Sequence, residues 1–413
     1  CSIFEMRAQK ISHDEWHNLT YARMPHPVKF QHSNNNLDLV KFKGRFYVAC
    51  RTAPTHFASK KTRLYVISST DMQNWDFEYD VFMETDLREP RFAVLGDSLY
   101  LYFFRGGTKM FKFEPKEILV TATNGTIGEW TKPANIGLDF YVPWRLRNEN
   151  DTLYLSAYYG KNLYNANHHA DLRLFTSVNG RAFLPISVEP QINIHTAEEG
   201  EFIFDKEHNL YATIRLEGSG SLICKASKDS LSKWTYKRYK HKYDSALLFD
   251  HDDDIYLVSR RNLDGEIDKS DYVYPDSNEI KSLPKSIAVT QTETNNTQPK
   301  DTTIKLKTES KEVTVTGNKN RAKRPPSRTS NLIRYSLTRK RTALFKFNKE
   351  KLDVEWLLDF PSTGDCSYPA IQKLNASDYL LMNYSSDIEK PEKNWIRGQL
   401  GKTYIYWTVL HFE

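Results

Sequence analysis

Apolar and polar positions alternate along this chain in short runs, and one pattern recurs from end to end. Residues 85–107 show it clearly, with an apolar run at 91–95, a turn at Gly96-Asp97 and a second, aromatic run at 99–104. Period-two alternation on both sides of a tight turn predicts a β-hairpin. The same pattern returns at residues 37–51, 144–159, 201–215, 246–260 and 370–384.

The spacing of these hairpins predicts how they assemble. Their turn residues Gly44, Asp97, Asp151, Asn209 and Asp254 are 53, 54, 58 and 45 residues apart. A period of about fifty residues with several short strands per repeat is typical of propeller blades, which must pack around a common axis. We therefore expect an all-β protein, a six-bladed β-propeller of four-stranded antiparallel blades, in a single domain over 1–413. Blades one to four are expected at 36–84, 85–137, 138–194 and 195–243.

Blade five begins near Tyr243 and is interrupted. Residues 266–340 are rich in Lys, Thr, Ser, Asn and Pro, and such a segment is too polar to bury a core, so we predict a low-complexity, disordered insertion there. The blade resumes at 342–347, and blade six follows from about 363. Trp16 precedes Trp75 by 59 residues. The N-terminal residues are therefore expected to add an outer strand to the last blade, beside 403–412, and so to close the ring.

Composition narrows the class of partner. The net charge is +6, but much of the basic excess falls between Lys269 and Lys346, so no nucleic-acid partner is expected. No apolar stretch approaches the ~20 residues that span a bilayer. No ligand spacing for a metal is present, and no cofactor is expected. The first residue, Cys1, fits either the lipid anchor of a mature bacterial lipoprotein or a fragment boundary. We expect a monomer outside the cytoplasm, secreted or lipid-anchored, although a cytoplasmic location stays open.

A second signal has the same period. Four blades carry Ser or Thr, then Asp or Asn, then an aromatic residue: Ser69, Asp71 and Trp75; Thr123, Asn124 and Trp130; Ser177, Asn179 and Phe183; Ser227, Asp229 and Trp234. Asp and Asn form side-chain turns, and the aromatic ring fills the space beneath the outer hairpin. In these motifs the chain resembles the Asp-box propellers, the sialidase-like and related glycosidases. The resemblance covers nearly the whole chain outside the insertion, and it implies a glycan or glycoconjugate as partner.

The topology of a blade places the start of its first strand and the end of its second on one side of the disc. Carboxylates, arginines and tyrosines gather at these positions. Carboxylates can serve as acid and base, aromatic rings stack on sugars, and Arg binds a substrate carboxylate. From this ring and the loops beside it we expect substrate-binding roles for Arg88, Arg215, Arg260, Arg51, Arg105, His56, Asp244 and Glu201.

The sialidase resemblance implies specific roles for three of the residues. Glu199, followed sixteen residues later by Arg215, resembles the Glu that activates a tyrosine nucleophile and a carboxylate-binding Arg. Tyr368 resembles the nucleophile itself. The chain departs from the pattern at residues 35–37, Asn-Asn-Leu, where these enzymes have an arginine. It also has no Asp between residues 51 and 63 to act as acid/base.

A rival resemblance is to furanosidase-type propellers, which use three carboxylates. It implies catalytic roles for Asp38 as base or nucleophile, Glu89 in Arg88-Glu89-Pro90, and Glu199 as acid. The leading expectation is a divergent glycoside hydrolase. The alternative is a non-catalytic propeller that binds carbohydrate or protein, because the fold survives the loss of catalytic groups.

Overall fold

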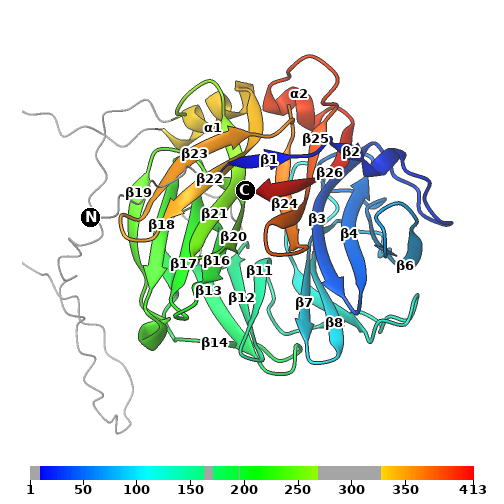
Figure 1. The fold of residues 1–413 in the computed structure, drawn as a ribbon, viewed down its shortest axis with the longest axis horizontal. Coiled ribbons are helices and arrows are strands. Elements are labelled where there is room, and N and C mark those ends of the chain that lie inside the picture. Colours follow the sequence, from blue (N-terminus) through cyan, green and yellow to red (C-terminus); the bar gives the residue numbers. More distant parts are fainter. Residues whose placement is uncertain (1–9, 162–170, 195, 268–326) are drawn as a thin grey trace, which may run out of the picture. The chain divides into compact units, whose positions relative to one another are not determined.

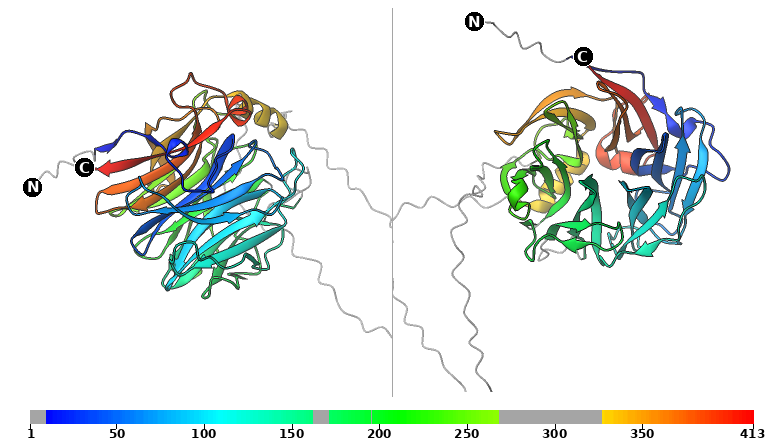
Figure 2. Two further views of the ribbon diagram at one scale, coloured as in Figure 1. Left: turned by 90° about the vertical axis from the view of Figure 1, so that its right-hand side faces the viewer. Right: turned by 60° about the horizontal axis from the view of Figure 1, so that its bottom comes forward.

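The computed structural model describes residues 10–161, 171–194, 196–267 and 327–413. Their strands form six antiparallel sheets, each of four main strands, arranged as blades around a common axis (Figure 2). The predicted six-bladed β-propeller is therefore confirmed. Cys1, the candidate lipid-anchor residue, lies outside the described residues.

In blades one to five the main strands follow in chain order across the sheet, and in blade six the N-terminal β1 lies outside the C-terminal strand (Figure 1). Blade one comprises β3 (Ser33–Phe42), β4 (Arg45–Ala53), β5 (Arg63–Ser69) and β6 (Asp76–Val81). Blade two comprises β7 (Leu87–Leu95), β8 (Ser98–Arg105), β9 (Glu117–Thr123) and β10 (Ala134–Asn135). Blade three comprises β11 (Tyr141–Glu149), β12 (Thr152–Tyr159), β13 (Asp171–Ser177), β14 (Leu184–Pro185) and the short β15 (Ile192–Asn193).

The second half of the chain repeats this order. Blade four comprises β16 (Ala197–Phe204), β17 (Leu210–Leu216), β18 (Ser221–Ala226) and β19 (Thr235–Tyr239). Blade five comprises β20 (Asp244–His251), β21 (Asp254–Asn262), β22 (Lys340–Asn348) and β23 (Asp353–Asp359). Blade six contains β24 (Ser367–Lys373), β25 (Asp378–Ser386) and β26 (Thr403–Phe412), with β1 (Ile11–His13) and β2 (His17–Asn18) as outer partners. Two short 3₁₀ helices, Leu19–Tyr21 and Lys228–Ser230, lie in connections.

The N-terminal residues close the ring as predicted. Strand β1 pairs antiparallel with β26, with Ile11 opposite Phe412, and β2 pairs with the same strand at His17 and Trp407. Figure 1 shows β1 beside the C-terminal strand. This pairing covers backbone groups of β26 that would otherwise form an open sheet edge.

The end of the predicted insertion was placed too far along the chain. Residues 268–326 lie outside the described residues, but helix α1 (Arg328–Leu337) precedes β22, which begins at Lys340. Ser327 caps α1 by accepting a hydrogen bond from Ser330 N, and Tyr335 is buried. Tyr335 packs edge-on against Trp395 of helix α2 (Trp395–Gln399), with ring centroids 5.2 Å apart. None of the described helices is long and apolar enough to cross a membrane.

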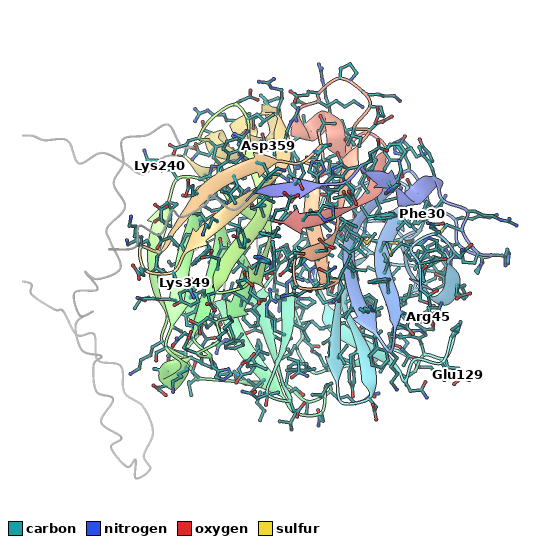
Figure 3. All side chains as sticks on the ribbon, viewed as in Figure 1. Phe30, Arg45, Glu129, Lys240, Lys349 and Asp359 are labelled. Carbon is teal, nitrogen blue, oxygen red and sulfur yellow. The ribbon has the colours of Figure 1, made fainter. Side chains whose placement is uncertain are left out.

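The hydrophobic core lies mainly between neighbouring blades. Leu64 and Val66 of blade one, for example, share a buried cluster with Leu101 and Phe103 of blade two. Figure 3 shows the described side chains on the ribbon. Arg45, labelled there, pairs with Asp76 and so links β4 to β6 across the face of blade one.

Turns between the third and fourth strands use the Ser/Thr and Asp/Asn pairs seen in the sequence. In blade one, Ser69 Oγ accepts from Met72 N at 2.8 Å and Asp71 Oδ1 accepts from Gln73 N at 2.8 Å. Asn179 makes the corresponding turn in blade three, accepting from Arg181 N at 2.9 Å. Trp75 is buried beside the first of these turns, so these residues are structural.

Candidate functional site

Every inner strand contains one extra residue near its start. In blade four, Glu198 lies opposite Arg215 but Glu201 lies opposite Thr213, so three steps on β16 match two on β17. The same one-residue mismatch occurs in β3, β7, β11, β20 and β24. A β-bulge of this kind breaks the alternation of the strand and re-aims a side chain.

Five of these bulges hold a non-glycine residue in the left-handed region of backbone space. These residues are Asn36 (φ 40°), Glu89 (φ 52°), Glu199 (φ 49°), Ser245 (φ 51°) and Tyr368 (φ 57°). The conformation costs a side-chain-bearing residue on the order of 1 kcal/mol and tends to occur at functional sites. All five residues line one cavity. The unfavourable backbone conformation therefore recurs around a single site.

The cavity has a volume of about 320 Å³ and lies at the end of the ring where the inner strands begin. Loops of blades one and two form one wall, where His56, Phe57 and Phe111 lie. Helices α1 and α2 contribute Tyr335, Trp395 and Gln399. Phe111 is 81% exposed and contacts Phe57 with ring centroids 5.3 Å apart. The cavity therefore has a polar base and an aromatic rim.

Tyr368 and Glu89 are paired inside the cavity. The phenolic hydroxyl of Tyr368 donates a hydrogen bond to Glu89 Oε2, and Asn36 Nδ2 donates to Glu89 Oε1 at 3.2 Å. The Arg91 guanidinium lies over the Tyr368 ring, 4.3 Å from its centroid. Burial raises the pKa of Tyr368 well above its usual value, although Arg91 opposes this. Burial also raises the pKa of Glu89, although Arg91 and the tyrosine hydroxyl oppose that shift.

Glu199 is bound to Arg215 rather than to Tyr368. Its Oε1 accepts from Arg215 Nη1, and its Oε2 accepts from Ser245 N at 2.7 Å. Burial is the largest effect on this carboxyl and raises its pKa to about 7, even though Arg215 opposes the shift. A carboxyl with this pKa is about half protonated near neutral pH and can give or take a proton.

A third cluster joins blade five to α1. Asp244 accepts from the Tyr335 hydroxyl and pairs with Arg260 Nη1 at 3.2 Å. Arg260 also donates to the Cys366 carbonyl oxygen at 2.8 Å. Lys242 Nζ lies 3.9 Å from the centroid of the Tyr335 ring. Although burial alone would raise the pKa of Asp244, Arg260 and Lys242 hold it well below its usual range.

His56, from a loop of blade one, and Arg88, from β7 of blade two, lie together in the cavity lining. His56 Nδ1 lies 2.6 Å from Asp365 Oδ2, and Asp365 also accepts from the Tyr384 hydroxyl at 2.9 Å. Arg88 pairs with Asp86 and donates to the His56 carbonyl oxygen at 2.8 Å. The structure thus brings eight of the twelve sequence-predicted residues to one cavity: Glu199, Tyr368, Glu89, Arg88, Arg215, Arg260, His56 and Asp244.

Arg51 and Arg105, expected to bind substrate, do not line this cavity. Arg51 is fully buried and pairs with Asp86 at 2.8 Å, which joins blades one and two. In blade two the residue opposite Arg88 is Phe104, not Arg105. Since neighbouring side chains on a strand point to opposite faces, Arg105 turns away and pairs with Glu117 of β9.

Asp38 and Glu201 lie deeper along the axis. Each is two residues beyond a bulge, about 6–7 Å further along its strand. Asp38 accepts from Phe92 N at 2.7 Å and lines a separate cavity of about 250 Å³ together with Arg145. Glu201 is fully buried and pairs with Arg145 and, at 2.8 Å, with Arg147. The three-carboxylate arrangement built on Asp38 is therefore not assembled in the main cavity.

Several cavity residues were not selected from the sequence as site residues. They are the pair Glu217 and Lys242, which neighbour Arg215 and Asp244, and the wall residues Tyr335, Trp395, Gln399 and Phe111. Tyr335 carried a detectable signal, because a Ser cap followed by ten residues without Gly or Pro favours a helix. The bulges also left a signal in the sequence, since Pro90, Gly200 and Pro369 follow three of the five left-handed residues, and Pro or Gly inside a strand is typical of a bulge. Within the described parts of the chain, no group of three or more His, Cys, Asp or Glu residues is arranged to hold a metal.

Fold and site together define a six-bladed propeller with an ionisable cavity at one end of its axis. Solved structures that resemble it include a sialidase, an endosialidase and a protein of unknown function. Trypanosoma rangeli sialidase superposes with a TM-score of 0.62 at 10% identity, over 98% of this chain and 60% of that chain. Phage phi92 endosialidase superposes with a TM-score of 0.57 at 10% identity, over 98% of this chain and 69% of that chain. A protein of unknown function from Dyadobacter fermentans superposes with a TM-score of 0.61 at 10% identity, over 98% of this chain and 99% of that chain.

This chain is thus a divergent propeller of the sialidase-like fold, and at this identity the likeness concerns the fold alone. It spans about 60% of the length of the trypanosomal sialidase. No family model and no curated protein matches it.

Proposed function

We propose that this protein acts on glycans as a glycoside hydrolase whose reaction takes place in the bulge-lined cavity. The observation that carries the proposal is the hydrogen bond from the Tyr368 hydroxyl to Glu89 inside that cavity. A phenol is a weak nucleophile until a neighbouring base takes its proton. Glu89 supplies that base, a role that the sequence resemblance had implied for Glu199.

The proposed reaction has two steps. In the first, the Tyr368 oxygen attacks the anomeric carbon while its proton passes to Glu89, and Glu199 gives a proton to the departing oxygen. In the second, water attacks the same carbon, gives a proton to Glu199 and releases the tyrosine oxygen, which regains its proton from Glu89. The pKa of Glu199, about 7, suits a group that must donate and then accept.

The rim supports a sugar as the ligand. Phe111 and Phe57 present apolar surface beside a base made of carboxylate, guanidinium and hydroxyl groups. Sugar rings combine apolar faces with hydroxyl edges, and such a cavity contacts both. The sialidase named above and the phage endosialidase show that this fold accommodates glycan-active sites.

Hydrolysis of a panel of aryl glycosides tests the proposal. Tyr368→Phe is expected to abolish turnover while leaving the melting temperature nearly unchanged, and Glu89→Gln should reduce kcat by about 100- to 10,000-fold. Tyr102→Phe is the matched control, because this buried phenol donates to the Gly180 carbonyl oxygen at 2.6 Å, outside the cavity.

Mass spectrometry with a slowly hydrolysed fluoro-glycoside should find the sugar on the peptide that contains Tyr368. Turnover that survives in Tyr368→Phe would contradict the proposed nucleophile. Sugar binding without turnover of any substrate would favour the alternative, a non-catalytic carbohydrate-binding propeller.

A further inference from the structure

The cations of the cavity are already neutralised by carboxylates of the protein itself. Arg215 shows this most fully. It is bound by Glu198 and Glu199 at its two terminal nitrogens, and its Nε lies 3.2 Å from Glu217 Oε2. All of these groups are at least four-fifths buried. Three carboxylates thus surround this guanidinium, although its Nε makes no hydrogen bond within the described residues, so an incoming acid would compete with them for the terminal nitrogens.

The other buried cations are bound in the same way. Arg260 is paired with Asp244 at 3.2 Å and donates to the Cys366 carbonyl oxygen. Lys242 lies 3.1 Å from Glu217 and 3.4 Å from Asp244. Arg88 is paired with Asp86. Lys112, the remaining cation in the cavity lining, is exposed at the rim.

Most of the charge in the lining is paired. Four buried cations, Arg88, Arg215, Lys242 and Arg260, face four acidic side chains, Glu89, Glu199, Glu217 and Asp244, and Lys112 adds an exposed positive charge at the rim. In blade one the bulge position is Asn36, an uncharged residue. A substrate carboxylate would have to displace a protein carboxylate from its cation and leave it buried and unpaired, which is strongly unfavourable.

Four buried polar atoms of the lining residues make no hydrogen bond within the described residues. They are the acceptors Asn36 Oδ1 and Asp244 Oδ1 and the donors Arg215 Nε and Trp395 Nε1. Buried polar atoms of this kind are normally satisfied by water or by a ligand. Sugar hydroxyl groups can donate to such oxygens, whereas a carboxylate cannot.

We infer that the cavity takes an uncharged sugar and discriminates against sialic and uronic acids. This inference rests on the proposed function, because it assumes that the cavity is the glycan site. It reverses the expectation that the arginines bind a substrate carboxylate. The same arginines instead hold Glu199, Glu217 and Asp244 in place.

Matched sugars that differ only at C6 test the inference directly. Binding of glucose against glucuronate, and galactose against galacturonate, is measured by calorimetry on Tyr368→Phe, so that the result does not depend on turnover. N-acetylneuraminate is included as a third acid. At least one neutral sugar is expected to bind. Glucuronate and galacturonate should bind at least about 100-fold more weakly than glucose and galactose, and N-acetylneuraminate at least about 100-fold more weakly than the tighter neutral sugar. An acid that binds as tightly as its partner would overturn the charge preference while leaving a glycan site in place. A cavity that binds no sugar would overturn both the inference and the proposed function.

Removal of a carboxylate from beside Arg215 should weaken the preference for neutral sugars. Glu217→Gln removes one carboxylate from the neighbourhood of Arg215 and Lys242. The affinity for the acidic sugars should then rise about 10-fold relative to that for the matched neutral sugars. Glu117→Gln is the control, because this carboxylate pairs with Arg105 outside the cavity. An unchanged acid affinity in a folded Glu217→Gln protein would contradict the inference.

Discussion

Glu199 should make the protein less stable as the pH rises, and Glu199→Gln should remove this effect. The side chain is 10% exposed, and burial, only partly offset by Arg215, raises its pKa from 4.5 to about 7. A carboxyl with a raised pKa in the folded state contributes its full stability below about pH 4.5. That contribution is lost as the pH rises through 7.

The magnitude follows from the two pKa values. A difference of about 2.5 pH units corresponds to roughly 3 kcal/mol of unfolding free energy. Unfolding entropy is ~2.1 cal/mol/K per residue, or about 0.9 kcal/mol/K for 413 residues, so the melting temperature should change by about 4 °C. Glutamine resembles the protonated acid, so Glu199→Gln should melt about 4 °C above the wild type at pH 8, and the gap should shrink toward pH 5.

The assay is calorimetric melting of the wild type and Glu199→Gln between pH 5 and 8. Groups that titrate equally in both proteins change both melting temperatures alike, so the difference between the two temperatures reports Glu199. Glu217→Gln provides a control of opposite sign. Burial alone would raise the pKa of Glu217, but Lys242 and Arg215 lower it. Its ionised form therefore stabilises the fold above its ordinary pKa of 4.5, and that stability is lost as the pH falls. A gap between wild type and Glu199→Gln that stays constant from pH 5 to 8 would refute the reasoning.

Three further outcomes are expected. Arg91→Leu removes the cation that opposes the rise in the Tyr368 pKa. The value of kcat/KM should therefore fall at least about 10-fold, and its pH profile should change. An unaltered pH profile would contradict an effect of Arg91 on the tyrosine hydroxyl. Deletion of residues 10–18 uncovers β26 and should cause aggregation in light scattering; a truncated protein that stays monomeric with unchanged melting would argue against it. Replacement of residues 268–326 by a Gly/Ser linker should barely change the melting temperature, since loop-closure free energy changes by only ~0.6 kcal/mol per doubling of loop length. Extension of that replacement through Tyr335 should lower it by several degrees, and equal melting of the two replacements would show that α1 does not support the site.

The sequence alone was sufficient for the fold. Alternating runs, turn residues and a repeat near fifty residues predict six blades because side-chain alternation and turn chemistry are local properties. Closure by the N-terminal strand was also predictable, since an uncovered edge on the last blade is unfavourable wherever the chain begins. Eight candidate residues were found because equivalent ends of the strands meet at one side of a propeller.

The pairing of those residues was decided only by the tertiary structure. One extra residue in each inner strand turns Glu89, Glu199 and Tyr368 into the cavity, and a mismatch against a neighbouring strand cannot be counted from one strand alone. Tyr368 of blade six therefore pairs with Glu89 of blade two, two places away in the ring, while Glu199 pairs with Arg215 of its own blade. The prediction for Arg105 was wrong because Phe104, not Arg105, lies opposite Arg88, and neighbouring side chains on a strand point to opposite faces. Tyr335 reaches the cavity from α1 because its ring contacts Lys242 and Trp395, residues far from it in the chain, and such contacts depend on packing between blades rather than on local pattern.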